Sequence, residues 1–306
     1  MAIPAIDGLM SQGKRLPETA EALGELRDSS DVANDVDALR ARMEEDGYVF
    51  LRNYLDRDKV LAARREVLER IASEGGLDPD APLMDGVLRE GMSIRFDPKR
   101  TRNSRDLKSL VFDGEMMGFF TGFLGGEVRH LDYIWLRSVA PGRGTAPHGD
   151  SVFMNRGTTR LYTAWTPLGD IDRKLGGLII LENSHKLDHI KNDYGQRDVD
   201  TYCDDDPNAE EYLATGKQAW NGQLSDDPVE LREQLGGRWL TADFQPGDVL
   251  VFTMFTLHAS LDNQSSNRIR LSTDTRYQLA SEPVDERWIG EDPIAHGPNA
   301  KKEIIC

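Results

Sequence analysis

Residues 237–258 read GRWLTADFQPGDVLVFTMFTLH, and they show the local pattern that dominates the second half of the chain. Two short runs rich in β-branched and aromatic residues flank the turn-forming residues 246–248, which is typical of consecutive strands. If the second run is one strand, its last residue, His258, lies on the same face as Leu250 and Phe252, because side chains alternate along a strand. A lone histidine at a strand end is more often a hydrogen-bonded core residue than a ligand, so His258 needs a partner before it indicates a site.

The rest of the chain divides into helical patterns followed by β patterns. Four further β-like stretches are HLDYIWLRSVAPG, TTRLYTAWTPLGD, GGLIILENSH and NRIRLSTDTRYQ. Helical patterns cover residues 31–46, the stretch from Asp56 to the glycine pair 75–76, and residues 106–124. Helices followed by a run of strands predict an α+β, mainly β fold, in which helices cover one side of a β-sandwich or barrel.

The domain organisation follows from where this patterning begins and where it is interrupted. Residues 1–30 are weakly patterned, and we expect a loosely packed N-terminal arm. Residues 31–306 then suit a single domain. The interval 186–236 is acidic with short helical patterns, which predicts an insertion between two strands. One more strand is possible at 92–96, MSIRF.

Composition narrows the class of protein. The 306 residues include 37 Lys and Arg against 53 Asp and Glu, a formal net charge of −16, and no basic stripe interrupts this balance. We therefore expect no nucleic-acid partner, because the phosphate backbone would be repelled. The two cysteines, Cys203 and Cys306, cannot form a disulfide framework, which favours a reducing compartment. With no apolar stretch of membrane-spanning length, we expect a cytoplasmic protein without a membrane partner; the sequence does not indicate its oligomeric state.

His148–Gly149–Asp150 places an imidazole and a carboxylate two residues apart. In extended backbone these side chains point to the same side, so both can reach one point. A second histidine would complete the two-histidine, one-carboxylate arrangement that binds non-haem Fe(II) and leaves coordination positions open. The triplet alone is weak, because a polar turn is the commoner explanation. His258, elsewhere in the β region, is the candidate third ligand.

The stretch NRIRLSTDTRY at 267–277 supplies a polar strand face within hairpin distance of His258. Arginine, serine and aspartate alternate there with mostly apolar residues. The commoner explanation is a solvent-exposed, charged face. The alternative is a buried guanidinium, which needs an anionic partner and binds a planar carboxylate well. Arg270 and Ser272 share this face and would bind the distal carboxylate of a dicarboxylate that chelates the metal.

Several of these motifs, in order along the chain, resemble the phytanoyl-CoA dioxygenase (PhyH) family of Fe(II)- and 2-oxoglutarate-dependent oxygenases. They are EDGYVFLRNYLDRDKVLAARREVLERI near the N-terminus, HGD at 148–150, LYTAWTPLGD at 161–170, GGLIILENSHK at 176–186, QPGDVLVF at 245–252, and H-x-S-x-x-N with a later R-x-S at 258–272. The resemblance runs from about residue 40 to residue 280. It implies a double-stranded β-helix, a cupin-like jelly-roll barrel of roughly eight strands with flanking N-terminal helices. It also implies Fe(II), 2-oxoglutarate and O2 as cofactor and cosubstrates.

Carried over position by position, the resemblance implies roles for seven residues. They are His148, Asp150 and His258 as the catalytic iron ligands, Arg270 with Ser272 as the partners of 2-oxoglutarate, Trp165 beside the cosubstrate, and Ser260 two residues after the distal histidine. Two departures from the family pattern exist. The usual PGSHK is ENSHK at 182–186, and the loop before Arg270 is slightly long, which leaves Arg268 as an alternative carboxylate partner.

The expected reaction is hydroxylation of an unactivated C–H bond of a small-molecule metabolite, with release of succinate and CO2. Relatives that halogenate carry a small residue in place of the carboxylate ligand, so the presence of Asp150 argues against halogenation. Desaturation, epoxidation or cyclisation in a secondary-metabolite pathway would use the same cofactors. A non-catalytic jelly-roll protein, or a Zn or Mn cupin-type enzyme, is the remaining alternative, although neither needs Arg270 and Ser272. The sequence does not identify the substrate.

Overall fold

The structure, a computed structural model, describes residues 8–92, 94, 99–200, 220–296 and 300. Most of the possible strand at 92–96, the middle of the interval 186–236 and both cysteines lie outside the described residues. No helix in the described part of the chain is long and apolar enough to cross a membrane.

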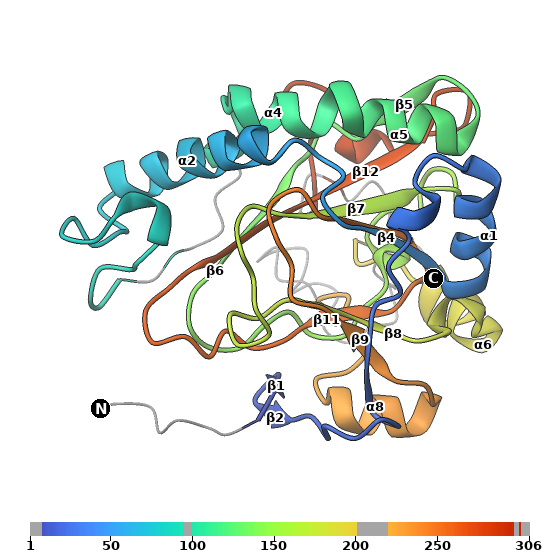
Figure 1. Ribbon diagram of the computed structural model, residues 1–306. Helices are drawn as coiled ribbons and strands as arrows, with labels where there is room; N and C mark the ends of the chain where they lie inside the picture. Colours follow the sequence, from blue (N-terminus) through green and yellow to red (C-terminus); the bar gives the residue numbers. More distant parts are fainter. Residues whose placement is uncertain (1–7, 93, 95–98, 201–219, 297–299, 301–306) are drawn as a thin grey trace.

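Two β-sheets form the centre of the fold (Figure 1). The larger sheet has the order β4-β10-β7-β12-β5, and β6 also pairs with β12; its strands are β4 Tyr48–Leu51, β5 Val128–His130, β6 Trp135–Val139, β7 Tyr162–Pro167, β10 Val249–Thr253 and β12 Arg270–Leu279. The smaller sheet has the order β11-β8-β9-β3; its strands are β3 Leu23–Glu25, β8 Leu178–Leu181, β9 Trp239–Thr241 and β11 His258–Ser260. A short hairpin of β1 Met10–Ser11 and β2 Lys14–Arg15 precedes them. Among these strand pairs only β3 with β9 is parallel.

Helices cover the outer face of the larger sheet, where α2, α4 and α5 lie side by side (Figure 1). The helices are α1 Val36–Asp46, α2 Arg57–Ser73, α3 Lys99–Arg102, α4 Arg105–Phe112, α5 Gly114–Leu124, α6 Asp188–Asn192 and α8 Pro228–Leu235. Short 3-10 helices occur at η1 Ser30–Val32, η2 Leu83–Asp85, η3 Asp150–Val152, η4 Ser184–Lys186, η5 Tyr194–Gln196 and η6 Glu286–Trp288. The predicted α+β fold is confirmed, and its sheets are antiparallel except where β3 pairs with β9.

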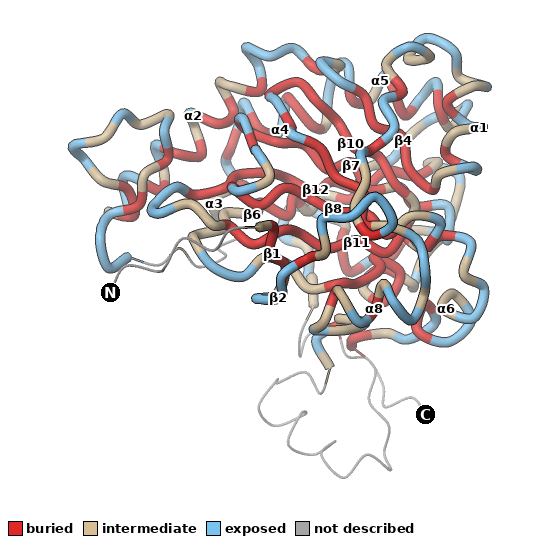
Figure 2. The backbone as a smooth tube through the Cα atoms, turned by 60° about the horizontal axis from the view of Figure 1, so that its bottom comes forward, coloured by how far each residue is buried: buried red, intermediate tan, exposed pale blue. Residues whose placement is uncertain are grey.

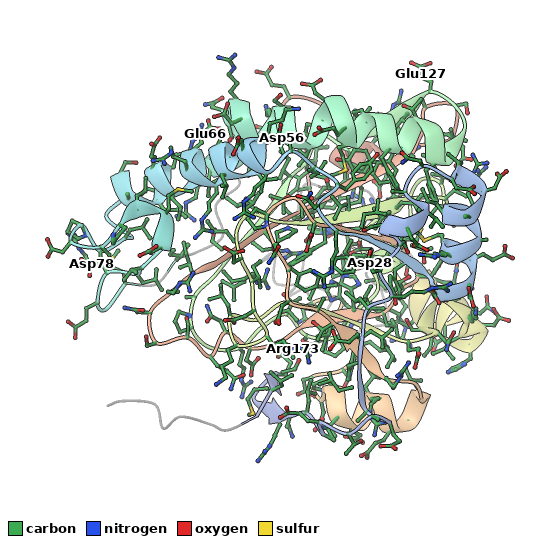
Figure 3. The ribbon with its side chains drawn as sticks, viewed as in Figure 1. Asp28, Asp56, Glu66, Asp78, Glu127 and Arg173 are labelled. Atoms are coloured by element: carbon green, nitrogen blue, oxygen red, sulfur yellow. The ribbon has the colours of Figure 1, made fainter. Side chains whose placement is uncertain are left out.

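Strand β10 shows how one sequence builds two hydrophobic layers. Val249 and Val251 pack with the helices, whereas Leu250 and Phe252 pack against the smaller sheet. All four are essentially inaccessible, and Figure 2 shows β10 and its neighbours β4 and β7 buried over most of their length. The alternation of side chains along a strand therefore fills both layers. Charged residues such as Asp78 and Glu127 lie at the periphery of the molecule (Figure 3).

Three local expectations need correction. The stretch after residue 248 is not one strand: β10 ends at Thr253, a turn follows, and His258 begins β11 in the other sheet. His258 therefore does not share a strand face with Leu250. The helical pattern at 106–124 is two helices, α4 and α5, because the backbone turns at Asp113 and at Gly114, where φ is 54°. Finally, β12 does not form a hairpin with β11, since it pairs with β5, β6 and β7 in the larger sheet.

The N-terminal arm is more closely packed than its weak patterning suggests. Leu9 and Leu16 are buried in a cluster with residues of the smaller sheet. The backbone N–H groups of Gln12 and Gly13 donate to the carboxylate of Asp262. Strand β3 adds to the edge of β9, so the arm completes the smaller sheet.

Candidate metal centre

His148, Asp150 and His258 meet between the two sheets. Their potential ligand atoms all lie within 4.8 Å of one another, and all three residues are buried. No other group of three or more His, Cys, Asp or Glu side chains in the described residues has this proximity. Residues 148–150 and His258, which lie far apart in the sequence, are therefore close together in the fold.

Backbone pairing places the two histidines. His148 and His258 form an isolated antiparallel bridge, in which each N–H donates to the other residue's carbonyl, at 3.0 and 2.9 Å. Gly149 is extended, with φ −114° and ψ 146°, so Asp150 points to the same side as His148 although it begins the 3-10 helix η3 and not a strand. The expectation that His148 and Asp150 face one point is confirmed, although the two residues do not lie in a single strand.

Each imidazole is oriented by a backbone carbonyl. Nδ1 of His148 lies 2.8 Å from the carbonyl oxygen of Ala146, and Nδ1 of His258 lies 3.0 Å from that of Thr256. A carbonyl only accepts, so Nδ1 carries the proton and Nε2 keeps its lone pair for a metal. Burial, together with the neighbouring His258, lowers the pKa of His148 to about 3, and burial also lowers the pKa of His258. Both rings are therefore neutral near pH 7, as metal ligation requires.

Asp150 is held as a carboxylate by two side chains from the larger sheet. Nη2 of Arg276 donates to both carboxylate oxygens, at 3.1 and 3.0 Å, and the Thr163 hydroxyl donates to Oδ2. Burial alone would raise the pKa of Asp150, but the guanidinium of Arg276 outweighs it and holds that pKa well below its ordinary value. The cluster therefore offers two neutral nitrogens and one anionic oxygen.

Arg270 is a buried cation close to this cluster. Its side chain is 2% exposed, and its Nη1 donates to the Ser272 hydroxyl at 2.7 Å. Its Nε has no hydrogen-bond partner, and no carboxylate of the described residues lies within ion-pairing distance of it. Burial lowers its pKa to about 10, which still leaves it charged at neutral pH. Asp274 lines the same cavity and acts on Arg270 electrostatically but forms no ion pair with it, so Arg270 keeps the properties of a carboxylate-binding group.

The other residues expected beside the cosubstrate line the same narrow cavity as Arg270. Trp165 packs edge-on against Phe244, and Ser260 accepts a hydrogen bond from the backbone N–H of Thr145 at 2.7 Å. The cavity is about 20 Å³, so a dicarboxylate enters only when lining side chains shift. Arg268 is exposed and donates to the carbonyl of Asp85, away from the cluster. Burial therefore favours Arg270 over Arg268.

Sequence reasoning assigned no role to three further residues of the site. Arg276 lies on the polar face of β12, but its pairing with Asp150 depends on how the sheets face each other. Thr163 on β7 and Arg137 on β6 stand in apolar runs that carry no signal of a polar site. A larger pocket of about 420 Å³ opens beside the cluster, lined in part by Arg137, Arg276, His148 and Asp150.

The donor set tests which metal fits. Two imidazole nitrogens and one carboxylate oxygen on one side of a buried point match the facial arrangement of non-haem Fe(II) sites, with the remaining positions free for other ligands. The unpaired guanidinium of Arg270 beside these groups fits the distal carboxylate of 2-oxoglutarate. The fold and this cluster together define a non-haem iron oxygenase of the double-stranded β-helix class.

Comparison with known proteins identifies the family. The phytanoyl-CoA dioxygenase (PhyH) family model matches residues 43–272, well over half of the chain. The chain belongs to the PhyH family, and it is an Fe- and 2-oxoglutarate-dependent oxygenase, as the sequence predicts. This decides against a non-catalytic jelly-roll protein and against a Zn or Mn cupin-type enzyme.

Similar proteins of known activity share most of their length with this chain. The 1-deoxypentalenic acid 11-beta-hydroxylase of Streptomyces exfoliatus is 27% identical over 274 residues, which cover 85% of this chain and 87% of the relative. The enzyme of the same name from Streptomyces arenae is 26% identical, with the same coverage of both chains.

Solved structures show the same fold at lower identity. The epimerase SnoN from nogalamycin biosynthesis, solved with Fe3+, alpha ketoglutarate and nogalamycin RO, has a TM-score of 0.55 and 20% identity, with coverage of 86% of this chain and 94% of that one. EctD from S. alaskensis, solved with bound Fe, has a TM-score of 0.53 and 18% identity, with coverage of 92% and 90%.

Proposed function

We propose that the protein hydroxylates an unactivated C–H bond of a small-molecule metabolite, with His148, Asp150 and His258 as the iron ligands. The observation that carries this proposal is the buried convergence of these three side chains within 4.8 Å. Two relatives covering most of the chain are named as hydroxylases of a small organic molecule, which supports the reaction type.

Arg270 and Ser272 would hold the distal carboxylate of 2-oxoglutarate, and Trp165 and Ser260 would line its cavity. This placement offsets the charge of Arg270, which has no carboxylate partner within the described residues. When bound, iron and 2-oxoglutarate would activate O2, the oxidant for C–H cleavage; one oxygen atom of O2 would enter the hydroxyl group and the other the succinate that forms, with CO2, from 2-oxoglutarate. The protein supplies ligand orientation and a site shielded from water.

Asp150 favours hydroxylation over halogenation because it would occupy the position that a halide needs. Thr163 and Arg276 both donate to its carboxylate, so this side chain is fixed and cannot swing away to open that position. Fixed hydrogen-bonded partners of a ligand set its orientation and basicity.

The substrate would lie in the pocket of about 420 Å³ beside the cluster. Pockets of this size suit small ligands and not polymers. Its wall includes His148 and Asp150, so a bound molecule would face the metal directly.

The test is succinate formation with Fe(II), O2 and 2-oxoglutarate, measured across a library of small metabolites. We expect at least one compound to stimulate succinate release and to gain one oxygen atom from O2. His148→Ala should abolish both signals, whereas Arg173→Gln, a change at a partly exposed residue that lines neither cavity of the site, should preserve them. Absence of 2-oxoglutarate turnover by the wild-type protein under every condition would overturn the proposal.

A further inference from the structure

The pocket beside the metal centre combines an apolar wall with two arginines. Trp135, Phe153 and Met154 form apolar wall, and Arg137 and Arg276 contribute guanidinium groups. The single carboxylate of the lining is Asp150. The pocket lining therefore has more arginines than carboxylates, whereas the whole chain has a net charge of −16.

Arg137 presents free donors to this pocket. It lies on β6 opposite Ser272 of β12, and its Nε donates to Asp274 at 2.8 Å. Within the described residues its two terminal amino groups make no hydrogen bond. They are also open to solvent, because neither is among the fully buried polar atoms that lack a partner. Two parallel N–H donors in this position match the geometry of a carboxylate.

Arg276 adds a second positive group deeper in the same pocket. Its guanidinium lies 3.9 Å over the ring of Trp135, and only its Nη2 is engaged, by Asp150. Its Nε and Nη1 have no partner although they are buried. The cation is therefore fixed by stacking and by one ion pair, and its field reaches the pocket.

In the described residues, the carboxylates beside Arg137 leave its two terminal amino groups without an acceptor. Asp274 accepts only from Nε of Arg137, and Asp150, the carboxylate of the pocket lining, accepts from Arg276. A guanidinium edge with free donors beside an apolar wall fits a ligand that carries a carboxylate.

We propose that the substrate is a small monocarboxylic acid, whose carboxylate binds the terminal amino groups of Arg137 while its apolar part lies along Trp135, Phe153 and Met154. This inference rests on the proposed function, because it places the substrate in the pocket beside the iron ligands. The free edge of one guanidinium, with its two terminal amino groups, fits one carboxylate.

The experiment is an anaerobic calorimetric titration of the Fe(II)- and 2-oxoglutarate-loaded protein with octanoate, cyclohexanecarboxylate and adamantane-1-carboxylate, each compared with its primary amide. We expect at least one acid to bind about 10- to 100-fold more tightly than its amide, the range for charge-assisted hydrogen bonds. Arg137→Gln should bring that ratio close to one. The surface variant Arg173→Gln is the control and should keep it.

Asp274→Asn provides a test in the opposite direction. It removes the carboxylate that now pairs with Arg137, so the preference for the acid should increase. A variant that merely folds poorly cannot produce a gain. Equal binding of acid and amide by the wild-type protein, or binding of neither across the panel, would overturn the inference.

The visible absorption band of the Fe(II)–2-oxoglutarate complex separates this inference from the proposed function. We expect Arg137→Gln to retain the band and the affinity for 2-oxoglutarate while losing its preference for the acid. If Arg137→Gln weakens 2-oxoglutarate binding and leaves the acid preference intact, Arg137 is a cosubstrate contact and the inference is wrong. If the wild-type protein shows no band, the proposed function itself fails.

Discussion

Arg276 and Asp150 form an ion pair in which both side chains are buried. One amino nitrogen of Arg276 lies 3.1 and 3.0 Å from the two oxygens of Asp150, and both side chains are at most 2% exposed. The guanidinium fixes the carboxylate and lowers its pKa, so Asp150 remains an anion despite its burial. A carboxylate placed in this way is ready to ligate a metal without first losing a proton.

Replacing Arg276 with methionine should weaken Fe(II) binding about 10- to 100-fold, the usual cost of losing a partner of a metal ligand. The physical reason is that Asp150 would keep only Thr163 as a side-chain donor and would lose its orientation. Anaerobic Fe(II) titration followed by calorimetry measures this. Arg64→Met is the control, since Arg64 is also buried but donates to the carbonyls of Met84 and Leu168. An unchanged Fe(II) affinity in a folded Arg276→Met protein would show that the pair does not position the ligand.

Replacing Arg270 with methionine should raise the thermal stability of the protein and weaken its binding of 2-oxoglutarate. Its buried charge has no carboxylate within ion-pairing distance in the described residues, so the metal-free variant should melt at a higher temperature than the wild type. Loss of two charge-assisted hydrogen bonds should weaken 2-oxoglutarate binding by about 100-fold. Thermal melting and 2-oxoglutarate titration are the measurements. The exposed Arg268→Met should change neither; a loss of 2-oxoglutarate binding in that variant instead would reverse the assignment.

Glu66 connects α2 to the start of α4, and its replacement should lower the stability of the fold. It accepts hydrogen bonds from the Ser104 hydroxyl and from the backbone N–H groups of Arg105 and Asp106, at the start of α4. Glu66→Gln should therefore cost about 1 kcal/mol in the free energy of unfolding at pH 7. Glu69→Gln, exposed on the same helix, should stay within about 0.5 kcal/mol of the wild type. Urea unfolding measures both.

The pH dependence of this cost has a definite sign. Burial would raise the pKa of Glu66, but the hydrogen bonds from Ser104, Asp106 and Arg105 outweigh it and hold the pKa below 4.5. A group whose pKa is lower in the folded state stabilises the fold above its unfolded pKa, and this contribution disappears as the pH falls through the folded pKa. The difference between the wild type and Glu66→Gln should thus shrink in acid. A difference that grows as the pH falls would contradict this account.

The sequence predicts the candidate metal ligands because they complete one donor set and stand in the order of the PhyH motifs, although neither the His-Gly-Asp triplet nor His258 alone is specific. His148, Asp150 and His258 are recognisable by residue type, and Arg270 by its pairing with Ser272 in an R-x-S pattern. The error about His258 has a local cause. The turn between β10 and β11 contains buried Met254 and Leu257 and lacks Gly, Pro and Asn, so it reads as a continuation of the strand.

Other parts of the site depend on tertiary pairing that no local pattern encodes. Arg137 faces the site because β6 pairs with β12 in a register that places it opposite Ser272. Thr163 reaches Asp150 because β7 lies beside β12. The polar face of β12 could have pointed to solvent on its pattern alone, and only the closure of one sheet over the other makes it an interior face.

The central claim is that His148, Asp150 and His258 bind Fe(II) while Arg270 holds 2-oxoglutarate beside it. The most direct measurement is the visible absorption spectrum after Fe(II) and 2-oxoglutarate are added to the protein without oxygen. The account predicts a weak charge-transfer band in the wild type, its loss in His148→Ala, and a reduced amplitude at the same 2-oxoglutarate concentration in Arg270→Ala. A wild-type protein without the band, or a band that survives unchanged in His148→Ala, would contradict it.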